Sequence, residues 1–421
     1  MKEQKVHRLM LENGITLLLV ENQAADLIAG RIFLKNSGSR WENREKAGLF
    51  HLLAATLTKG SQKYSSVEIA EKVESIGAGL GADAGADYFV ISLKTITADF
   101  AEILSLVAEI IKFPTFPENE VEREKYLTQQ SIRSQQEQPF NVAFSQLREA
   151  MYPNHPYGLS LLGTAESVAQ ITRSDLEYCH YNHFCPEQMI ISLSGRITVA
   201  ESVQLIEDAF RDWKPESNGS TQLNLTPLQA NPLQKLTKQE TQQSIVMLGY
   251  LGASVKEDNY AILKLLNTYL GNGLSSRLFV ELREKRGLAY DVSSFYPTRL
   301  EPSQFVIYMG TAPQNTAIAI DGLHTEAERL CETELKPEEL QTAKNKLLGQ
   351  YALGKQTNAE MAQLFGWYET LELGIEFDSR FQEEIANITP EMARKVANQY
   401  LRLPYLSLVG PAAILDGYDE P

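Results

Sequence analysis

The sequence predicts an α+β fold in which two homologous α/β halves are duplicated within one chain, each with an antiparallel-rich sheet backed by helices. The chain has 421 residues, more than a single hydrophobic core usually supports. Segments with the pattern of strands alternate with segments with the pattern of helices, which is typical of layered α/β and α+β proteins. Two segments of the first half also recur in the second half at nearly the same spacing, which indicates an internal repeat.

Apolar runs bounded by turn residues define the elements expected in the first half. Runs rich in Leu, Ile, Val and Phe predict strands, whereas apolar residues recurring with helical spacing predict helices. The first helix is expected to stop near Gly60, and the second to lead into a turn rich in Gly and Ala. The expected strands are residues 14–20, 27–34 and 88–93, and the expected helices are residues 46–57, 67–76 and 100–111.

Two independent matches support the repeat. A helix opened by Ile171-Thr172 is followed by a strand, and the same order begins again at Ile388-Thr389, 217 positions later (388 minus 171). The tripeptide Phe89–Ile91 recurs as Phe305–Ile307, 216 positions later (305 minus 89). Two unrelated matches at nearly one offset indicate duplication of a whole half rather than a chance similarity.

The repeat also predicts a division of the chain. We expect an N-terminal half over residues 1–213, a polar, Pro-containing linker over residues 214–232, and a C-terminal half over residues 233–421. On this register Asn267 in the second half lies opposite His51 in the first.

Composition excludes some functions and locations. The net charge of −15 argues against a nucleic-acid partner, because binding a phosphate backbone needs a basic surface. No apolar signal core follows the residues 1–5, and no stretch is long enough to span a membrane. Three cysteines are too few, and odd in number, for a disulfide framework. We therefore expect a cytoplasmic protein with no membrane or nucleic-acid partner.

The segment around His51 resembles the zinc helix of the pitrilysin/insulinase peptidase family. That helix carries H-x-x-E-H, in which two histidines on one helix face hold a zinc ion and the glutamate acts as general base. Here His51 occupies the first position, Ala54 the position of the base and Ala55 that of the second ligand. Without the resemblance, a lone histidine among Leu and Ala residues is more often a packed core residue than a ligand.

The family's third zinc ligand is a glutamate on a later helix, in a context similar to residues 123–133. Gln130 and Ser131 stand where the glutamates would be. A catalytic zinc needs three protein ligands and an open position for water, so the remaining histidine is not enough. We expect no metal or other cofactor in this chain and no hydrolysis by this route alone.

The second half keeps a different part of the family pattern. Residues 271–290 closely resemble the segment G-x-G-x-S-S-R-L-F…L-R-E-K-x-G-L-A-Y. The residues themselves predict a helix that begins near Ser275 or Ser276, stops at Gly287 and precedes a strand. The resemblance implies that Arg283 and Tyr290 bind a peptide at the zinc site of a facing domain, since a guanidinium can hold a carbonyl or carboxylate and a phenol can donate to an oxyanion.

The resemblance extends to the His155–Gly158 segment and covers residues 6 to about 410. In the branch of the family that is similar to the mitochondrial processing peptidase, one subunit brings H-x-x-E-H and the other brings the Arg and Tyr. This chain resembles the second kind. The implied function is that of a non-catalytic, substrate-binding subunit of a heterodimeric zinc metallopeptidase, with zinc in the homologous partner and a peptide as substrate.

Other interpretations remain open. The same family contains non-enzymatic core subunits of respiratory complexes, so a scaffold role is one alternative. A second is a hydrolase with its own site, such as the Cys179–Cys185 tract, which includes His180 and His183. On a helix, however, the two histidines share a face from which the cysteines diverge, which favours a structural role. Similarly, Arg283 alone is typical of a solvated helix face, and Tyr290 of an ordinary strand aromatic.

Overall fold

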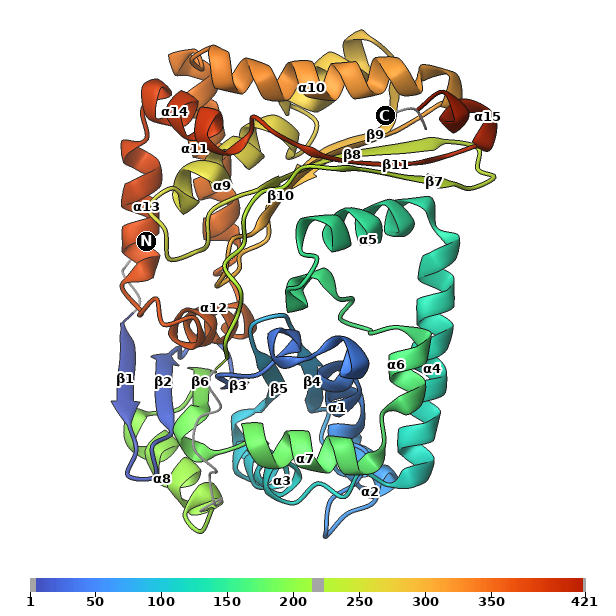
Figure 1. Cartoon of the computed structure of the whole chain (residues 1–421). Helices are drawn as coiled ribbons and strands as arrows, with labels where there is room; N and C mark the ends of the chain where they lie inside the picture. The colour runs from blue at the N-terminus through green and yellow to red at the C-terminus, as the bar shows by residue number, and fades with distance from the viewer. Residues whose placement is uncertain (1–4, 214–222, 419–421) are drawn as a thin grey trace. The chain divides into compact units, whose positions relative to one another are not determined.

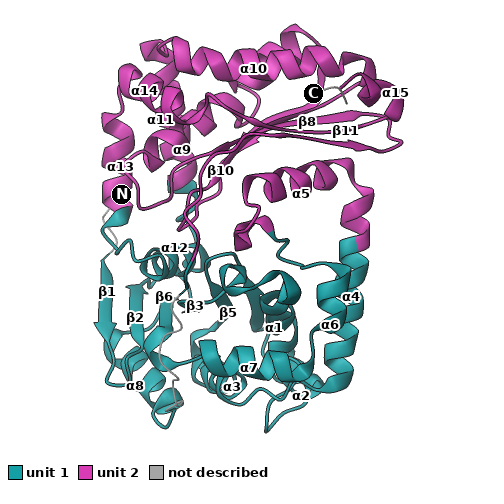
Figure 2. Cartoon of the chain, in the orientation of Figure 1, with its two compact units in different colours: residues 1–132, 159–224, 352–377 teal, residues 133–158, 225–351, 378–421 magenta. Residues whose placement is uncertain are grey.

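The computed structural model describes residues 5–213 and 223–418, so residues 214–222 of the expected linker lie outside the described residues. The chain forms two compact units, shown in two colours in Figure 2. Unit 1 takes residues 1–132, 159–224 and 352–377, and unit 2 takes residues 133–158, 225–351 and 378–421. Residues 133–158, from the N-terminal half of the sequence, thus belong to unit 2, and residues 352–377, from the C-terminal half, belong to unit 1.

Unit 1 contains a sheet whose six described strands are ordered β1-β2-β6-β3-β5-β4 (Figure 1). Only β2 and β6 pair in parallel among these strands; the other neighbours are antiparallel. The strands are β1 (Val6–Met10), β2 (Thr16–Glu21), β3 (Leu27–Leu34), β4 (Gly79–Ala84), β5 (Phe89–Ile96) and β6 (Met189–Gly195).

Several helices of unit 1 begin at a capping box. Ser65, Thr172, Thr198 and Thr357 each cap a helix in a capping box that satisfies free amides of the first turn. The helices are α1 (Leu49–Leu57), α2 (Ser66–Ser75), α3 (Phe100–Lys112), α4 (Glu118–Glu137), α6 (Ala165–Gln170), α7 (Arg173–His183), α8 (Val199–Phe210) and α12 (Asn358–Thr370).

Unit 2 repeats the same topology. Its five described strands are ordered β7-β11-β8-β10-β9, and only the pair β7 and β11 is parallel among them. This order matches β2-β6-β3-β5-β4 of unit 1 strand for strand, including the position of the parallel pair. The strands are β7 (Gln234–Lys238), β8 (Ser244–Leu251), β9 (Ala289–Phe295), β10 (Gln304–Thr311) and β11 (Tyr405–Gly410).

The prediction of two α/β units with antiparallel-rich sheets backed by helices is confirmed. The longer helices of unit 2 are α5 (Pro139–Met151), α9 (Tyr260–Gly271), α10 (Thr316–Glu332), α11 (Pro337–Leu353), α13 (Phe377–Asn387) and α14 (Pro390–Tyr400), and the short α15 (Ala412–Leu415) lies near the C-terminal end.

Helices are exchanged between the two halves of the sequence. α12, from the C-terminal half, packs on β3, β6 and β2 of unit 1, and α5, from the N-terminal half, packs on β11 and β8 of unit 2. Polar contacts fix both helices. On unit 1, Arg8 of β1 forms a 2.7 Å ion pair with the buried Glu369 of α12. On unit 2, Gln146 of α5 donates a 2.7 Å hydrogen bond to the Ser407 hydroxyl. Neither sheet is therefore covered by helices from one half alone.

Gly366 allows α12 to approach the sheet closely. A Cβ atom at Gly366 would lie 2.5 Å from Cε2 of Phe33 and 2.9 Å from Cβ of Ser192, far inside van der Waals contact. We expect Gly366→Ala to lower the free energy of unfolding by about 1–3 kcal/mol, because the buried ring and strand must shift to accommodate the methyl group. Urea denaturation of the full chain measures this change.

Gly349 provides the matched control. It lies exposed in α11, and a Cβ atom added there would have no neighbouring atom within 4 Å. Gly349→Ala should therefore raise stability by about 0.5–1 kcal/mol through helix propensity alone. A stabilising or neutral Gly366→Ala would contradict the close packing of α12 on unit 1.

Candidate functional site

A buried carboxylate holds the start of α1, the helix that carries His51. Glu42 is 5% exposed, and its two carboxylate oxygens accept hydrogen bonds from the amides of Gly48 at 2.9 Å and Phe50 at 2.7 Å. Both amides lie at the helix N-terminus, where they have no partner within the helix. Burial raises the pKa of Glu42 to about 8, although these two hydrogen bonds oppose the rise.

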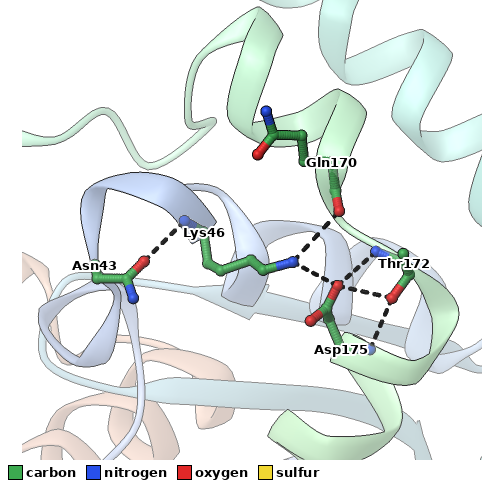
Figure 3. A network of polar contacts seen from close by, with 5 residues as sticks. All are labelled: Asn43, Lys46, Gln170, Thr172 and Asp175. Atoms are coloured by element: carbon green, nitrogen blue, oxygen red, sulfur yellow. Dashed lines mark hydrogen bonds and ion pairs between the residues drawn. The ribbon is translucent and has the colours of Figure 1, made fainter.

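The turn that leads into α1 is tied to α7 by a polar network (Figure 3). The Lys46 ammonium contacts the Asp175 carboxylate at 2.7 Å and donates to the Gln170 carbonyl at 3.3 Å. Asp175 also accepts hydrogen bonds from the backbone amide and hydroxyl of Thr172, which caps α7. The turn before α1 is thus positioned by contacts to residues 124 and 129 positions further along the chain.

His51 stands in α1 without the other donors of a zinc site. Its ring is half-buried, and burial lowers its pKa, while the charges of Asp83 on β4 and Glu124 on α4 act in the opposite direction. Ala54 is buried and Ala55 is half-buried, and neither side chain can bind a metal or take a proton.

The α4 positions of the expected third ligand also lack a donor directed at His51. Gln130 and Ser131 are both exposed, and the Ser131 hydroxyl donates to the Leu127 carbonyl of its own helix at 3.1 Å. Within the ranges that the structure describes, no group of three or more His, Cys, Asp or Glu side chains is placed to hold a metal ion. The residues present do not fit a catalytic zinc, so no step of hydrolysis is assigned to this site.

Sequence reasoning did not single out Asp83 or Glu124 as neighbours of His51. Asp83 lies on the edge strand β4, which pairs with β5 through Asp83 opposite Val90. Glu124 lies on α4, where it forms a 3.4 Å ion pair with Lys59. Only the folded arrangement of α1, β4 and α4 reveals this proximity; the sequence signal was limited to the position of Glu124 in the segment 123–133.

The segment that carries Arg283 forms a π-helix rather than a plain α-helix. This element, η6 (Phe279–Lys285), is followed by Gly287, whose φ of 62° is in the left-handed region that favours glycine. Arg277 stabilises its start, with ion pairs of 2.7 Å to the buried Glu326 of α10 and 2.8 Å to Glu281. Single π-helical turns are rare and often occur at functional sites.

Arg283 and Tyr290 are both exposed side chains of unit 2. The guanidinium carbon of Arg283 lies 5.1 Å from the ring centroid of Phe279, and Tyr290 on the edge strand β9 is 61% exposed. Among the described residues, neither side chain has an ion pair or a side-chain hydrogen bond, and no contact joins the two. Both groups are therefore available to a ligand from outside the chain.

The Cys179–Cys185 tract makes contacts within unit 1. The His180 ring nitrogen Nε2 lies 2.7 Å from the Ile111 carbonyl oxygen, and Nδ1 of His183 lies 2.6 Å from that of Asn36. Burial lowers the pKa of His180 to about 4 and raises the pKa of the Cys179 thiol. These contacts connect α7 to the end of α3 and to the turn after β3.

Across the described part of the chain, no helix has the length and apolar character needed to cross a membrane.

The fold defines the chain as a protein of two α/β units with the same strand order, and in the described residues the helix that carries His51 has no set of metal ligands. Residues 21–165 match the family model described as Insulinase (Peptidase family M16). Residues 170–347 match that described as Peptidase M16 inactive domain. The chain belongs to the pitrilysin/insulinase-like M16 peptidase family.

Relatives and solved structures match nearly the whole chain. The Bacillus subtilis protein described as "Uncharacterized zinc protease YmxG" is 27% identical over 415 residues, covering 97% of this chain and 98% of its own length. The peptidase M16 inactive domain from Pseudomonas fluorescens has a TM-score of 0.89 at 24% identity, covering 97% of this chain and 98% of that one. A protease from Helicobacter pylori has the same TM-score at 20% identity, covering 97% and 100%. These structural similarities show the shared fold.

The raised pKa of Glu42 predicts a pH-dependent stability. Between the ordinary pKa of 4.5 and about 8, the folded chain holds a proton on Glu42 that the unfolded chain releases. The contribution of Glu42 to the stability of the folded chain is therefore present at low pH and is lost as the pH rises through that window. Within the window, the unfolding equilibrium constant should rise by up to about tenfold per pH unit. Glu42→Gln, which cannot titrate, should remove this slope.

Urea denaturation between pH 5 and 8 measures the slope for both proteins. Glu177→Gln is the control, because Glu177 is an exposed glutamate that pairs only with Arg173 of its own helix in the described residues. Its slope should equal that of the unaltered chain. Parallel pH profiles for the unaltered chain and Glu42→Gln would mean that Glu42 is ionised in the folded state.

Proposed function

We propose that this chain is the non-catalytic, substrate-binding subunit of a heterodimeric zinc metallopeptidase. The observation that carries the proposal is the contrast between its two halves. The zinc helix of unit 1 retains only His51, whereas unit 2 presents Arg283 and Tyr290 exposed and, among the described residues, without an ion pair or side-chain hydrogen bond. A homologous subunit with an intact H-x-x-E-H helix would supply what this chain lacks.

The family comparisons support the peptidase part of this proposal. The matched relatives carry zinc protease in their names, and the model matched by residues 170–347 is described as an inactive domain. Pairing with a catalytic subunit, and binding of a peptide, are inferences from the retained Arg and Tyr.

Each retained side chain has a role that suits its chemistry. The Arg283 guanidinium presents several N–H donors in one plane, so it can hold a backbone carbonyl or a terminal carboxylate of the peptide with paired hydrogen bonds. The Tyr290 hydroxyl can donate a hydrogen bond to the oxyanion that forms when water attacks the scissile carbonyl. The zinc ion and general base of the partner would activate that water.

The location of Arg283 fits a binding role better than a structural one. Arg277, six residues earlier (283 minus 277), is neutralised by Glu281 and Glu326, and its ion pairs anchor the segment. Arg283 has no such partner in the described chain and packs over the ring of Phe279, which limits its rotamers without neutralising its charge. An anchored segment with a free guanidinium is a preorganised donor.

The first test compares the purified chain with its natural complex. The chain alone, with and without added zinc, and the chain copurified from its own cells are assayed on a mixed peptide library. Activity only in the complex with an H-x-x-E-H protein, lost on chelation, is the expected result. Zinc-dependent cleavage by the isolated chain would refute the proposal, and a complex with no activity would favour a scaffold.

In the active complex, Tyr290→Phe should lower kcat roughly 10²–10³-fold, because one oxyanion donor is worth about that much in rate. Arg283→Met should chiefly raise KM, since it removes contacts to bound peptide. Tyr178→Phe and Arg402→Met are the matched controls, because both residues are exposed and lie far along the chain from Arg283 and Tyr290. Copurification of the partner at unchanged stoichiometry confirms assembly. Unchanged kcat in Tyr290→Phe would remove Tyr290 from the mechanism.

A further inference from the structure

Unit 2 also contains three cationic residues that are far apart along the chain. Arg148 lies on α5, Lys264 on α9 and Arg299 between β9 and β10. The ring of Tyr260 lies beside Lys264, and its hydroxyl is 2.6 Å from that of Thr298, the residue before Arg299. Burial chiefly lowers the pKa of Arg148 and of Lys264; the charge of Glu149 raises that of Arg148, and the charge of Arg299 lowers the pKa of both, so the three lie within electrostatic reach. We call these three residues the cation cluster.

The two arginines of the cation cluster rest on aromatic rings. The guanidinium carbon of Arg148 lies 5.4 Å from the ring centroid of Phe144, and its Nε donates to the Gly158 carbonyl at 3.4 Å. The guanidinium carbon of Arg299 lies 5.5 Å from the ring centroid of Tyr157. Within the described chain, these contacts use one of the five N–H donors of Arg148 and none of those of Arg299.

Lys264 also contacts a backbone carbonyl and aromatic rings. Its Nζ donates to the Tyr296 carbonyl at 2.7 Å and lies 5.3 Å and 5.4 Å from the ring centroids of Tyr296 and Tyr260. Burial is the main cause that lowers its pKa to about 8, and the charge of Arg299 adds to it. Two donor positions of the ammonium remain unused in the described structure.

No carboxylate pairs with the cation cluster among the described residues. Cations in a poorly hydrated setting are normally paired, and this chain has 54 acidic against 39 basic residues to do so. The nearby Glu149 is exposed, and Glu257 accepts hydrogen bonds from the Ser254 amide and the Tyr400 hydroxyl instead. The charge of Glu149 acts on Arg148, but no carboxylate of the described chain forms an ion pair with the cluster.

We propose that the cation cluster binds an oxyanion, either the carboxylate of a peptide or a phosphate group. Arg148, Lys264 and Arg299 are each partly exposed, so an anion from solvent can reach them. Guanidinium groups bind carboxylate and phosphate with paired hydrogen bonds, and the aromatic surroundings exclude water and strengthen such contacts. Anion binding by this cluster does not depend on the proposed function, because it uses other residues and requires only the isolated chain.

Calorimetric titration of the full, isolated chain tests the site. The probes are inorganic phosphate, a short peptide with a free C-terminal carboxylate and the same peptide with a C-terminal amide. Saturable binding of phosphate or of the carboxylate peptide is expected, and the amide twin should bind at least about tenfold more weakly if the natural ligand group is a carboxylate. Binding of phosphate alone would assign the site to phosphate.

Variants assign the binding to these residues. Arg299→Met should weaken binding by about ten- to a hundredfold, as expected for loss of charge-assisted hydrogen bonds, and Arg299→Lys should retain part of it. Arg402→Met removes the same charge from an exposed position of unit 2 that pairs with Glu332, and should leave binding unchanged. If Arg299→Met fails to fold by circular dichroism, Lys264→Met provides the same test. No saturable binding of any probe, or equal affinities for Arg299→Met and Arg402→Met, would overturn the proposal.

Discussion

The packing of α12 and α5 onto sheets built mainly by the opposite half of the sequence is the constraint on which the rest of the fold depends. Each sheet needs a helical cover to keep its apolar face from water. Here Gly366 and the Arg8–Glu369 ion pair fix one cover, and Gln146 fixes the other. Because each cover comes from far along the chain, neither sheet is covered by the half of the sequence that builds most of it.

The contacts at the start of α1 stabilise this helix independently of any metal. Glu42 still binds the free amides at the start of α1, and Lys46 still ties the preceding turn to Asp175. These residues stabilise the helix whether or not a metal is bound. Alanine at positions 54 and 55 does not lower the stability of the helix, because alanine has the highest helix propensity and both positions are at least half-buried. The contacts that position α1 therefore do not require metal ligands at positions 54 and 55.

Local sequence signals predicted most of the elements of the first half. The strand expected over residues 27–34 is β3, and the helices expected over residues 67–76 and 100–111 are α2 and α3 within one residue at each end. The helix expected from residue 46 instead begins at Leu49, after a short 3-10 turn, because Gly48 adopts a φ of 92°. The internal repeat in the sequence also agrees with the matching strand orders of the two sheets.

What the sequence could not predict depends on contacts between distant residues. Nothing local to residues 358–370 indicates that α12 covers the sheet of unit 1, since amphipathic character does not identify a partner. The π-helical geometry at Arg283 likewise has no simple sequence signal: the residues predicted a helix ending at Gly287 but not its type. The cation cluster joins Arg148, Lys264 and Arg299 across 151 positions of sequence (299 minus 148), so neither spacing nor motif could reveal it.

The arginines of unit 2 differ in whether a carboxylate neutralises their charge. This difference distinguishes an arginine with a structural role from those for which a binding role is proposed. Arg277 has two carboxylate partners, so its charge is used inside the fold and offers little to a ligand. Arg283 and Arg299 have aromatic neighbours and no carboxylate partner in the described chain, although the protein carries an excess of acidic residues. A fold with net charge −15 could readily have neutralised them. For Arg283 and Arg299, we propose that the negative group arrives from outside the chain.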